Sequence, residues 1–405
     1  MTPKTTTVRD LRRGNRSRAL WQLHLRGPLS RQEVGSAIGV SMATVSNLVA
    51  ELIQLGAVVE GGVEDSTGGR PRGLLRINAE YGYVIGVDIG ETAFLVELFD
   101  FGMEVRASHR SSTELIRLDP EDAIGHVLAG IDAVIAESGV DRERILGVGV
   151  GVPGLVEQGA DAVVHGQSVG WDAVPFERLM RARTDLPVLL DNGAKTLGQA
   201  ERWFGAARDC LNVVVVLLGI GVGASIVTDD APYRGATGSA SEWGHTTVVV
   251  GGRTCRCGAS GCLEAYIGAA SIVDRYDELR GAPGDSDPRA LERRIAEIFS
   301  SETTDLAAGR VVEETIAYLG AGLSTLINLL NPERIVVGGW LGHALGDGRM
   351  PRIRESASRA ALHFAFGHVD IVPAQLGSDA VALGAATLPI ALALNAGAAR
   401  PSARR

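Results

Sequence analysis

An apolar strand, a glycine-rich turn and a second apolar strand occur in this order twice along the chain of 405 residues, at 83–99 and again at 213–228. A pattern that repeats in this way is typical of a duplicated supersecondary unit. Helical segments such as 120–138 follow the strands, which favours sheets covered by helices. The sequence therefore predicts an α/β body of two related lobes, at about 81–200 and 205–393.

Residues 1–80 differ from this body in charge. They carry 11 Lys and Arg against 7 Asp and Glu, whereas the remainder of the chain carries 28 against 41. A basic end on an acidic body suggests that only the basic end contacts an anionic polymer, although a solvated basic tail would have the same composition. No apolar run reaches the ~18 residues of a membrane helix, and residues 1–20 lack the apolar core of a signal peptide. We therefore expect a cytoplasmic protein without a membrane partner.

The periodicity of residues 1–80 predicts a helix, a second helix, a turn, a third helix and a two-stranded wing. Apolar positions indicate a first helix over 12–25, and Ser30 and Ser41 are typical N-caps of the next two. Apolar strands at 57–59 and 74–77 enclose a polar, glycine-rich stretch. This order is typical of a winged helix-turn-helix, which binds DNA. A small helical bundle that packs on the body is the alternative.

The third helix carries the candidate DNA contacts. Short polar side chains on the face opposite its apolar residues can pair with base edges or phosphates in the major groove; these are Ser41, Thr44, Ser46 and Asn47. The wing carries Arg70 and Arg72, and guanidinium groups on a flexible tip suit a narrow minor groove. We expect a double-stranded DNA operator as the partner, bound by a homodimer or a dimer of dimers.

Three of the four cysteines fall within eight residues, and a histidine precedes them. The set is His245, Cys255, Cys257 and Cys262. Thiolates and a neutral imidazole are suitable tetrahedral ligands for zinc. Because the protein fills all four positions, the zinc is expected to be structural, with no open position for water. Redox-active or unliganded cysteines are the alternative.

Glycine-rich segments and the cysteine cluster together resemble the signature of the ROK family, which groups repressors, open reading frames and sugar kinases. The segments are 218–223, 235–238, the Glu-x-Gly-His sequence at 242–245 and the Cys-x-Cys-Gly-x-x-Gly-Cys-x-Glu sequence at 255–264. The resemblance covers residues 12–390. It implies an actin-like, ribonuclease H-like domain over 81–393 with a sugar cleft between its lobes, after a winged helix-turn-helix over 1–80. Residues 394–405 are expected to form a disordered tail.

The resemblance also implies the sugar contacts. By position in the family motifs they are Asn192, Glu242, His245 and Glu264. Carboxylates and an imidazole can bind adjacent hydroxyl groups, as recognition of a polyol requires. Zinc would fix the loop that aims His245 and Glu264 at the sugar. Gln167 and Ser168 depart from the usual Asn-Leu of a family loop, which leaves the preferred sugar open.

Three positions depart from the kinases of the family. Their pattern is roughly Asn-Asp-Ala-Asn followed by Glu-x-x-Phe-Gly, and counting back from residues 201–205 puts Gly193 where the catalytic Asp belongs. Asp191 lies two positions earlier, a displacement of ~6.6 Å along an extended chain, whereas a base must come within roughly 3 Å of its proton donor. In the two turns that bind the ATP phosphates in the family's kinases, Glu91 replaces a glycine and Ile220 replaces a threonine. Both replacements disfavour the binding of ATP.

These features predict a sugar-responsive transcriptional regulator, in the simplest case a repressor of carbohydrate uptake or metabolism, without kinase activity. Its effector would be a small sugar or sugar phosphate. Two alternatives remain. One is a bifunctional ATP-dependent sugar kinase that also binds DNA, and the other is a body that docks a transport or signalling protein in place of a sugar.

Overall fold

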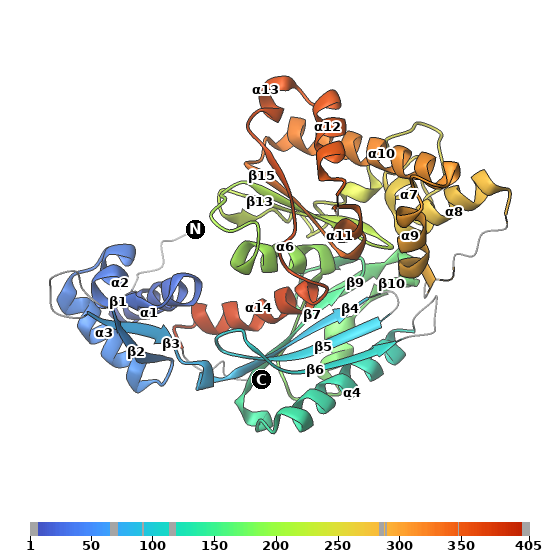
Figure 1. The fold of residues 1–405 in the computed structure, drawn as a ribbon. Helices are drawn as coiled ribbons and strands as arrows, with labels where there is room; N and C mark the ends of the chain where they lie inside the picture. Colours follow the sequence, from blue (N-terminus) through green and yellow to red (C-terminus); the bar gives the residue numbers. More distant parts are fainter. Residues whose placement is uncertain are drawn as a thin grey trace.

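The computed structural model describes residues 7–64, 72–90, 93–112, 119–282, 287, 290–346 and 348–398. The chain forms an N-terminal unit of helices and short strands, followed by two α/β lobes (Figure 1). The mixed α/β class predicted from the sequence is confirmed. In the described part of the chain, no single helix is long and apolar enough to cross a membrane, and only the bent pair of α2 and α3 meets those criteria jointly.

The N-terminal unit has the order of a winged helix-turn-helix. Its elements are α1 (Val8–Arg26), β1 (Leu29–Ser30), α2 (Arg31–Ile38), α3 (Met42–Gln54), β2 (Val58–Glu64) and β3 (Arg72–Ile77). Ser30 caps α2 and Ser41 caps α3, each accepting a hydrogen bond from a backbone N–H in the first turn. The axes of α2 and α3 differ in direction by 110°, as in a helix-turn-helix. The two-residue strand β1, which pairs with β3, was not predicted from the sequence.

The first lobe is built on a five-stranded sheet in the order β11-β7-β4-β5-β6. β4, β5 and β6 are antiparallel, whereas β4, β7 and β11 are parallel. Helix α4 packs on β5 and β6, and α14 packs on β4 and β7. The elements are β4 (Tyr83–Ile89), β5 (Ala93–Asp100), β6 (Val105–Ser112), α4 (Pro120–Ser138), β7 (Ile145–Val152), α5 (Phe176–Arg181), β11 (Val188–Asn192) and α14 (Ala380–Asn395). A separate three-stranded sheet follows β7 in the chain, formed by β8 (Leu155–Glu157), β9 (Val163–Gly166) and β10 (Trp171–Val174).

The second lobe repeats the sheet of the first, with the order β14-β13-β12-β15-β16. β12 pairs antiparallel with β13 and parallel with β15, as β4 does with β5 and β7. The predicted duplication is therefore confirmed strand by strand. The strands are β12 (Val213–Leu218), β13 (Val222–Thr228), β14 (Ala231–Pro232), β15 (Arg334–Gly338) and β16 (Asp370–Pro373). The helices are α7 (Glu264–Ile267), α8 (Ala269–Arg280), α9 (Leu291–Ser300), α10 (Leu306–Leu330), α11 (Trp340–Gly346), α12 (Met350–Ala360) and α13 (His363–Phe366).

Helices α6 (Gly193–Phe204) and α14 connect the two lobes. α6 packs on β12 and β13 of the second lobe and on α14 of the first. Close approach here depends on glycine: a Cβ on Gly149 would lie 1.8 Å from the carbonyl oxygen of Ala385, and one on Gly384 would lie 1.9 Å from that of Thr196. α14 therefore packs backbone to backbone on both β7 and α6.

The N-terminal unit shares a hydrophobic core with the first lobe. Leu20 and Leu23 of α1 belong to the same buried cluster as Phe99 of β5 and Ile390 of α14. The indole Nε1 of Trp21 donates a hydrogen bond to Oδ1 of Asn395 over 2.9 Å. Figure 1 shows α1 beside α14. The two parts of the chain are therefore packed together.

This packing corrects the expected start of the tail. Leu394 and Asn395 are the last residues of α14, and Leu394 is fully buried. Ala398 is 3% exposed, and its carbonyl accepts a hydrogen bond from the hydroxyl of Tyr81. The prediction of disorder is wrong for residues 394–398, because they pack against α1 and its surroundings. Residues 399–405 lie outside the described part.

Candidate functional site

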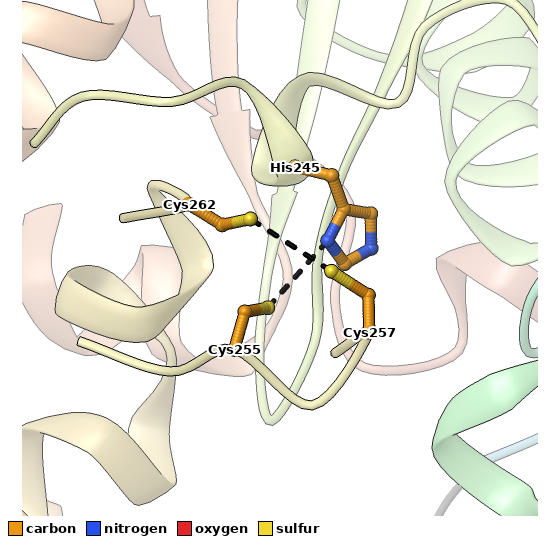
Figure 2. Close-up of side chains that lie close together, drawn as sticks. All are labelled: His245, Cys255, Cys257 and Cys262. Carbon is orange, nitrogen blue, oxygen red and sulfur yellow. Dashed lines mark hydrogen bonds between the residues drawn. The ribbon is translucent and has the colours of Figure 1, made fainter. Parts of the chain in front are cut away.

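Four side chains of the second lobe converge on one point. Figure 2 shows His245, Cys255, Cys257 and Cys262 directed toward one another. Their ligand atoms all lie within 4.8 Å of one another; the Cys257 and Cys262 sulfurs are 3.8 Å apart and the Cys255 sulfur is 3.6 Å from Nδ1 of His245. Four ligands at ~2.3 Å from a tetrahedral ion would be separated by ~3.8 Å. The cluster can therefore hold a metal ion.

The loop between His245 and α7 brings these ligands together. Thr247 forms a β-bridge with Cys262, and Thr254 with Ser260. Gly261 has φ +82°, and a Cβ there would lie 1.7 Å from the carbonyl oxygen of Val249. Glycine is required at this position because the chain folds back on itself.

Without a cation, the electrostatics of the cluster favour neutral thiols over thiolates. Burial raises the pKa of the Cys255 thiol to about 12, and it also raises the pKa of the Cys262 thiol. A divalent cation opposes this effect, because it stabilises thiolates directly. The fourth cysteine, Cys210, lies in a different hydrophobic cluster and takes no part.

Three of the expected sugar contacts lie around this centre. His245 directs Nδ1 at the sulfurs, and the other ring nitrogen points away from them (Figure 2). Glu264 begins α7; its Oε2 accepts a hydrogen bond from the Val222 amide over 2.9 Å, and its Oε1 is 3.5 Å from Nε of Arg256. Burial raises the pKa of Glu242, whose carboxylate is also influenced by the charges of His245 and Glu264. No described residue donates a hydrogen bond to the Glu242 carboxylate.

Asn192, the fourth expected contact, caps helix α6. Its Oδ1 accepts hydrogen bonds from the amides of Ala194 and Lys195 over 2.9 and 3.3 Å, and its Nδ2 donates to the carbonyl of Gly154 over 2.6 Å. Gly193 is the first residue of the helix. A Cβ at Gly193 would have its nearest neighbours at 3.7 and 3.8 Å, which is ordinary contact. The backbone therefore does not require glycine here.

The neighbouring Asp191 is held in an ion pair that sequence reasoning missed. Arg234 contacts it through two hydrogen bonds, of 2.6 Å to Oδ2 and 3.2 Å to Oδ1. Oδ1 also accepts the amide of Asn192 over 2.9 Å. The Asp191 side chain is 5% exposed. Its hydrogen-bonding capacity is therefore used within the protein.

Lys195 was also missed. It lies in the first turn of α6, is half-buried, and donates a hydrogen bond from Nζ to the carbonyl of Gly238. Burial lowers its pKa, while the charges of Asp191 and Glu242 raise it. A signal was available, because a lysine in the first turn opposes the helix dipole and falls on the second Asn of the kinase pattern Asn-Asp-Ala-Asn.

The structure describes only part of the two turns, after β4 and between β12 and β13, that were expected at the phosphate-binding positions. Asp88 near the end of β4 is half-buried, and burial raises the pKa of its carboxyl group to about 7 against the opposing charge of Arg110. Glu91 lies outside the described residues. Ile220 lies between β12 and β13 and packs against the core of the second lobe.

The expected DNA contacts lie together on one exposed surface. Ser41, Thr44, Ser46 and Asn47 are all exposed at the N-terminal end of α3. Ser46 donates a hydrogen bond to the carbonyl of Met42 over 2.9 Å, so its hydroxyl is partly used by the helix. Arg72 is the first residue of β3, and Arg70 lies outside the described residues.

The duplicated two-lobed fold, the cluster of His245 with three cysteines and the N-terminal helix-turn-helix together define a multidomain α/β protein with a candidate metal centre. Residues 84–391 match the ROK family, and the chain belongs to that family. The xylose repressor of Caldicellulosiruptor bescii is 30% identical over 368 residues, which cover 89% of this chain and 92% of that protein. The glucokinase of Halalkalibacterium halodurans is 31% identical over 317 residues, or 75% of this chain and 93% of that enzyme.

A solved structure agrees with these relatives. It is described as a ROK family transcriptional regulator that is a homologue of the E. coli MLC protein, and it superposes with a TM-score of 0.77 at 25% identity. It covers 96% of this chain and 98% of its own. The repressor and the regulator match nearly the full length, whereas the glucokinase leaves about a quarter of this chain unmatched.

Proposed function

We propose that this protein is a sugar-responsive transcriptional repressor that acts on genes of carbohydrate uptake or metabolism. The observation that carries the proposal is the near full-length similarity to a xylose repressor, in a chain whose helix-turn-helix exposes Ser41, Thr44 and Asn47 on α3. These side chains would contact bases or phosphates in the major groove, with Arg70 and Arg72 of the wing near the minor groove. A homodimer would place two α3 helices on half-sites about 34 Å apart.

The effector would bind at Asn192, Glu242, His245 and Glu264. The carboxylates and the outer nitrogen of the imidazole can each bond to neighbouring hydroxyl groups of a carbohydrate. His245, Cys255, Cys257 and Cys262 would hold a structural zinc ion, which bonds to thiolates and imidazole with tetrahedral geometry. With Nδ1 engaged there, His245 would keep its ring orientation and present its other nitrogen to the effector.

We infer that the site binds its ligand without phosphorylating it. A sugar kinase needs a carboxylate that accepts the proton of the attacking hydroxyl, and residue 193 is glycine. Asp191 is a poor substitute, because two guanidinium hydrogen bonds and one amide already occupy it. The alternative of a bifunctional kinase is favoured by the glucokinase relative.

Helix α6 offers a route from the effector to the DNA. Asn192 caps its N-terminus, Lys195 lies in its first turn, and its last turn contains Trp203, whose ring lies 5.2 Å from Trp21 of α1 in a T-shaped contact. The helix has 12 residues and is thus about 18 Å long. A ligand that shifts the first turn would therefore move a packing partner of the DNA-binding unit.

Fluorescence anisotropy of labelled DNA from upstream of the gene tests the proposal. The wild type should bind at low salt and be released by a carbohydrate from a panel of neutral and acidic sugars. Asn47→Ala should lose DNA binding but keep carbohydrate binding. Glu264→Gln should lose carbohydrate binding but keep DNA binding. Absence of DNA binding at low salt would reject the proposal. Release of ADP from ATP in the presence of the effector would favour the kinase.

A further inference from the structure

The basic residues of this chain are almost all arginine. Of its 39 Lys and Arg, 37 are arginine, and the two lysines are Lys4 and Lys195. Lys4 lies outside the described residues, so Lys195 is the single lysine in the described part. It stands in the candidate effector site, on the helix capped by Asn192. The compact ammonium of lysine binds an anion as a point charge, without the forked geometry of a guanidinium.

Lys195 has no carboxylate counter-ion within the described part of the chain. No described carboxylate lies within 4.0 Å of Nζ of Lys195. The Nζ instead donates a hydrogen bond to the neutral carbonyl of Gly238. Asp191 is already paired with Arg234 through two hydrogen bonds. Glu264 has Arg256 at 3.5 Å. Of the two carboxylates whose charges act on Lys195, Asp191 is thus paired with an arginine and Glu242 lies beyond ion-pair distance.

The position of Lys195 is costly without an anion. A half-buried charge loses solvation that a neutral carbonyl only partly replaces. A cation in the first turn is also repelled by the positive end of the helix dipole. Burial accordingly lowers the pKa of the ammonium. An ammonium has three N–H donors, so donors remain after the bond to Gly238.

We propose that the effector is an acidic carbohydrate, with a carboxylate or phosphate group that the Lys195 ammonium binds beside Asn192 and Glu242. This inference rests on the proposed function, because it assigns a chemical class to the ligand of the same site. Glu242, His245 and Glu264 would bind the hydroxyl groups, and Lys195 would select the charged end. Gly193 contributes by leaving the start of α6 without the carboxylate that would repel such a group.

Calorimetry with matched pairs of ligands tests the inference. The pairs are glucose with gluconate and glucose 6-phosphate, xylose with xylonate, and galactose with galacturonate; the carboxylate and phosphate arms separate the two kinds of anion. The wild type should bind one acidic member roughly 10- to 100-fold more tightly than its neutral partner, as a charged hydrogen bond allows. Lys195→Met should reduce this preference to less than about threefold, while Lys195→Arg should keep part of it.

The rarity of lysine allows a readout that does not depend on affinity. Reductive methylation with ¹³C-formaldehyde keeps the charge and labels only Lys195, Lys4 and the terminal amine, and Lys195→Arg assigns the signal. The Lys195 resonance should shift with the acidic ligand and stay in place with its neutral partner. Lys4→Arg is the matched control and should change neither the affinity nor that shift.

Several outcomes would overturn the inference. Binding of a neutral sugar as tight as that of its acidic partner would do so, as would unchanged preference in Lys195→Met. If a neutral sugar also releases DNA, the proposed function stands and only this inference fails. If no carbohydrate of either class binds, both the inference and the effector part of the proposed function fail.

Discussion

Asp191 and Gly193 lie two residues apart at the start of α6, and their environments are the basis of the proposal that neither acts as a base. Gly193 has no side chain, although a Cβ would meet nothing closer than 3.7 Å. Asp191 has a carboxylate, but Arg234 and the Asn192 amide occupy it. Asp191 is therefore one partner of an ion pair with Arg234, and position 193 offers no carboxylate.

Asp191→Asn should lower stability. The exchange leaves Arg234 without its counter-ion, and breaking a well-buried pair costs about 3–5 kcal/mol; we expect roughly 1–3 kcal/mol because the Arg234 side chain is 40% exposed and solvent screens it. Urea denaturation measures the change. Arg234→Gln should cost a similar amount, and the double variant less than the sum. Unchanged stability together with lost ATP turnover would indicate that Asp191 is catalytic.

Gly193→Asp should be tolerated. The nearest atoms to a Cβ are at ordinary contact distance, and an acidic side chain at the first helical position favours the dipole. We expect a change of less than about 0.5 kcal/mol in the free energy of unfolding. The same variant should bind an acidic effector more weakly, because it restores a carboxylate near Lys195. A large loss of stability would show that glycine serves packing at this position.

Residues 245–262 form the loop that carries the cysteines. The structure of this loop should depend on a bound metal ion more than that of any other element. Residues 245–262 are held by two isolated β-bridges and by backbone hydrogen bonds of turns and loops, without an α-helix or a regular strand ladder. A metal ion would supply the missing cross-link. It would also fix the side chains of His245 and Glu264 relative to α6.

Metal removal should therefore weaken effector binding. Purified protein should contain about one zinc per chain, and dialysis against a strong chelator should lower the Tm and reduce effector affinity about 10- to 100-fold. Cys257→Ser should reproduce both effects. Cys210→Ala is the control and should retain zinc, because Cys210 packs in another cluster. Full effector affinity in zinc-free protein would contradict this role.

In the molecule as a whole, the N-terminal helix-turn-helix unit shares a buried hydrophobic cluster with the first lobe. The ring of His24 lies 5.5 Å from Trp203 and 6.4 Å from Phe101, and its Nε2 is buried without a hydrogen-bond partner. Burial lowers the pKa of His24 to about 4. An aromatic cluster with a neutral histidine thus joins α1 to α6.

This cluster should give the contact a pH dependence. Because the folded pKa of His24 lies below the unfolded value of about 6.5, the unfolded chain binds the extra proton first. Stability is therefore complete above pH 6.5 and falls as the pH decreases toward 4, by up to about 3 kcal/mol. Tm measured from pH 8 to pH 4 gives the slope. His24→Phe should flatten it between pH 6.5 and 4, and an unchanged slope would show that other groups dominate.

The same contact should carry the signal between the sites. Trp203→Phe keeps an aromatic ring at the end of α6 but reduces its contact with Trp21 and His24. We expect affinities for DNA alone and effector alone to change less than about twofold, while the effector-induced change in DNA affinity falls at least about fivefold, or about 1 kcal/mol of coupling. Trp171→Phe, in the first lobe away from α1, is the control. Undiminished coupling would mean that the signal takes another route.

The sequence correctly predicted the features that depend on residues close together in the chain. Ser30 and Ser41 mark helix starts because each caps its own helix, and the duplicated strand pairs follow from their apolar runs. The four candidate metal ligands were predicted because three are close in sequence. In contrast, Arg234 reaches Asp191 across 43 residues and Trp21 reaches Asn395 across 374. Such contacts depend on how α6 and α14 pack, which no local periodicity encodes, and the tail prediction failed for the same reason.

One sample can report both DNA release and the chemical fate of the ligand. Operator DNA, the protein, MgATP and the effector are mixed, anisotropy reports the bound DNA, and mass spectrometry then identifies the effector recovered from the same tube. We predict that the DNA is released and the carbohydrate is recovered unchanged. Recovery of a newly phosphorylated carbohydrate, in an amount that Asp191→Asn abolishes, would contradict the central claim that this site senses its ligand without modifying it.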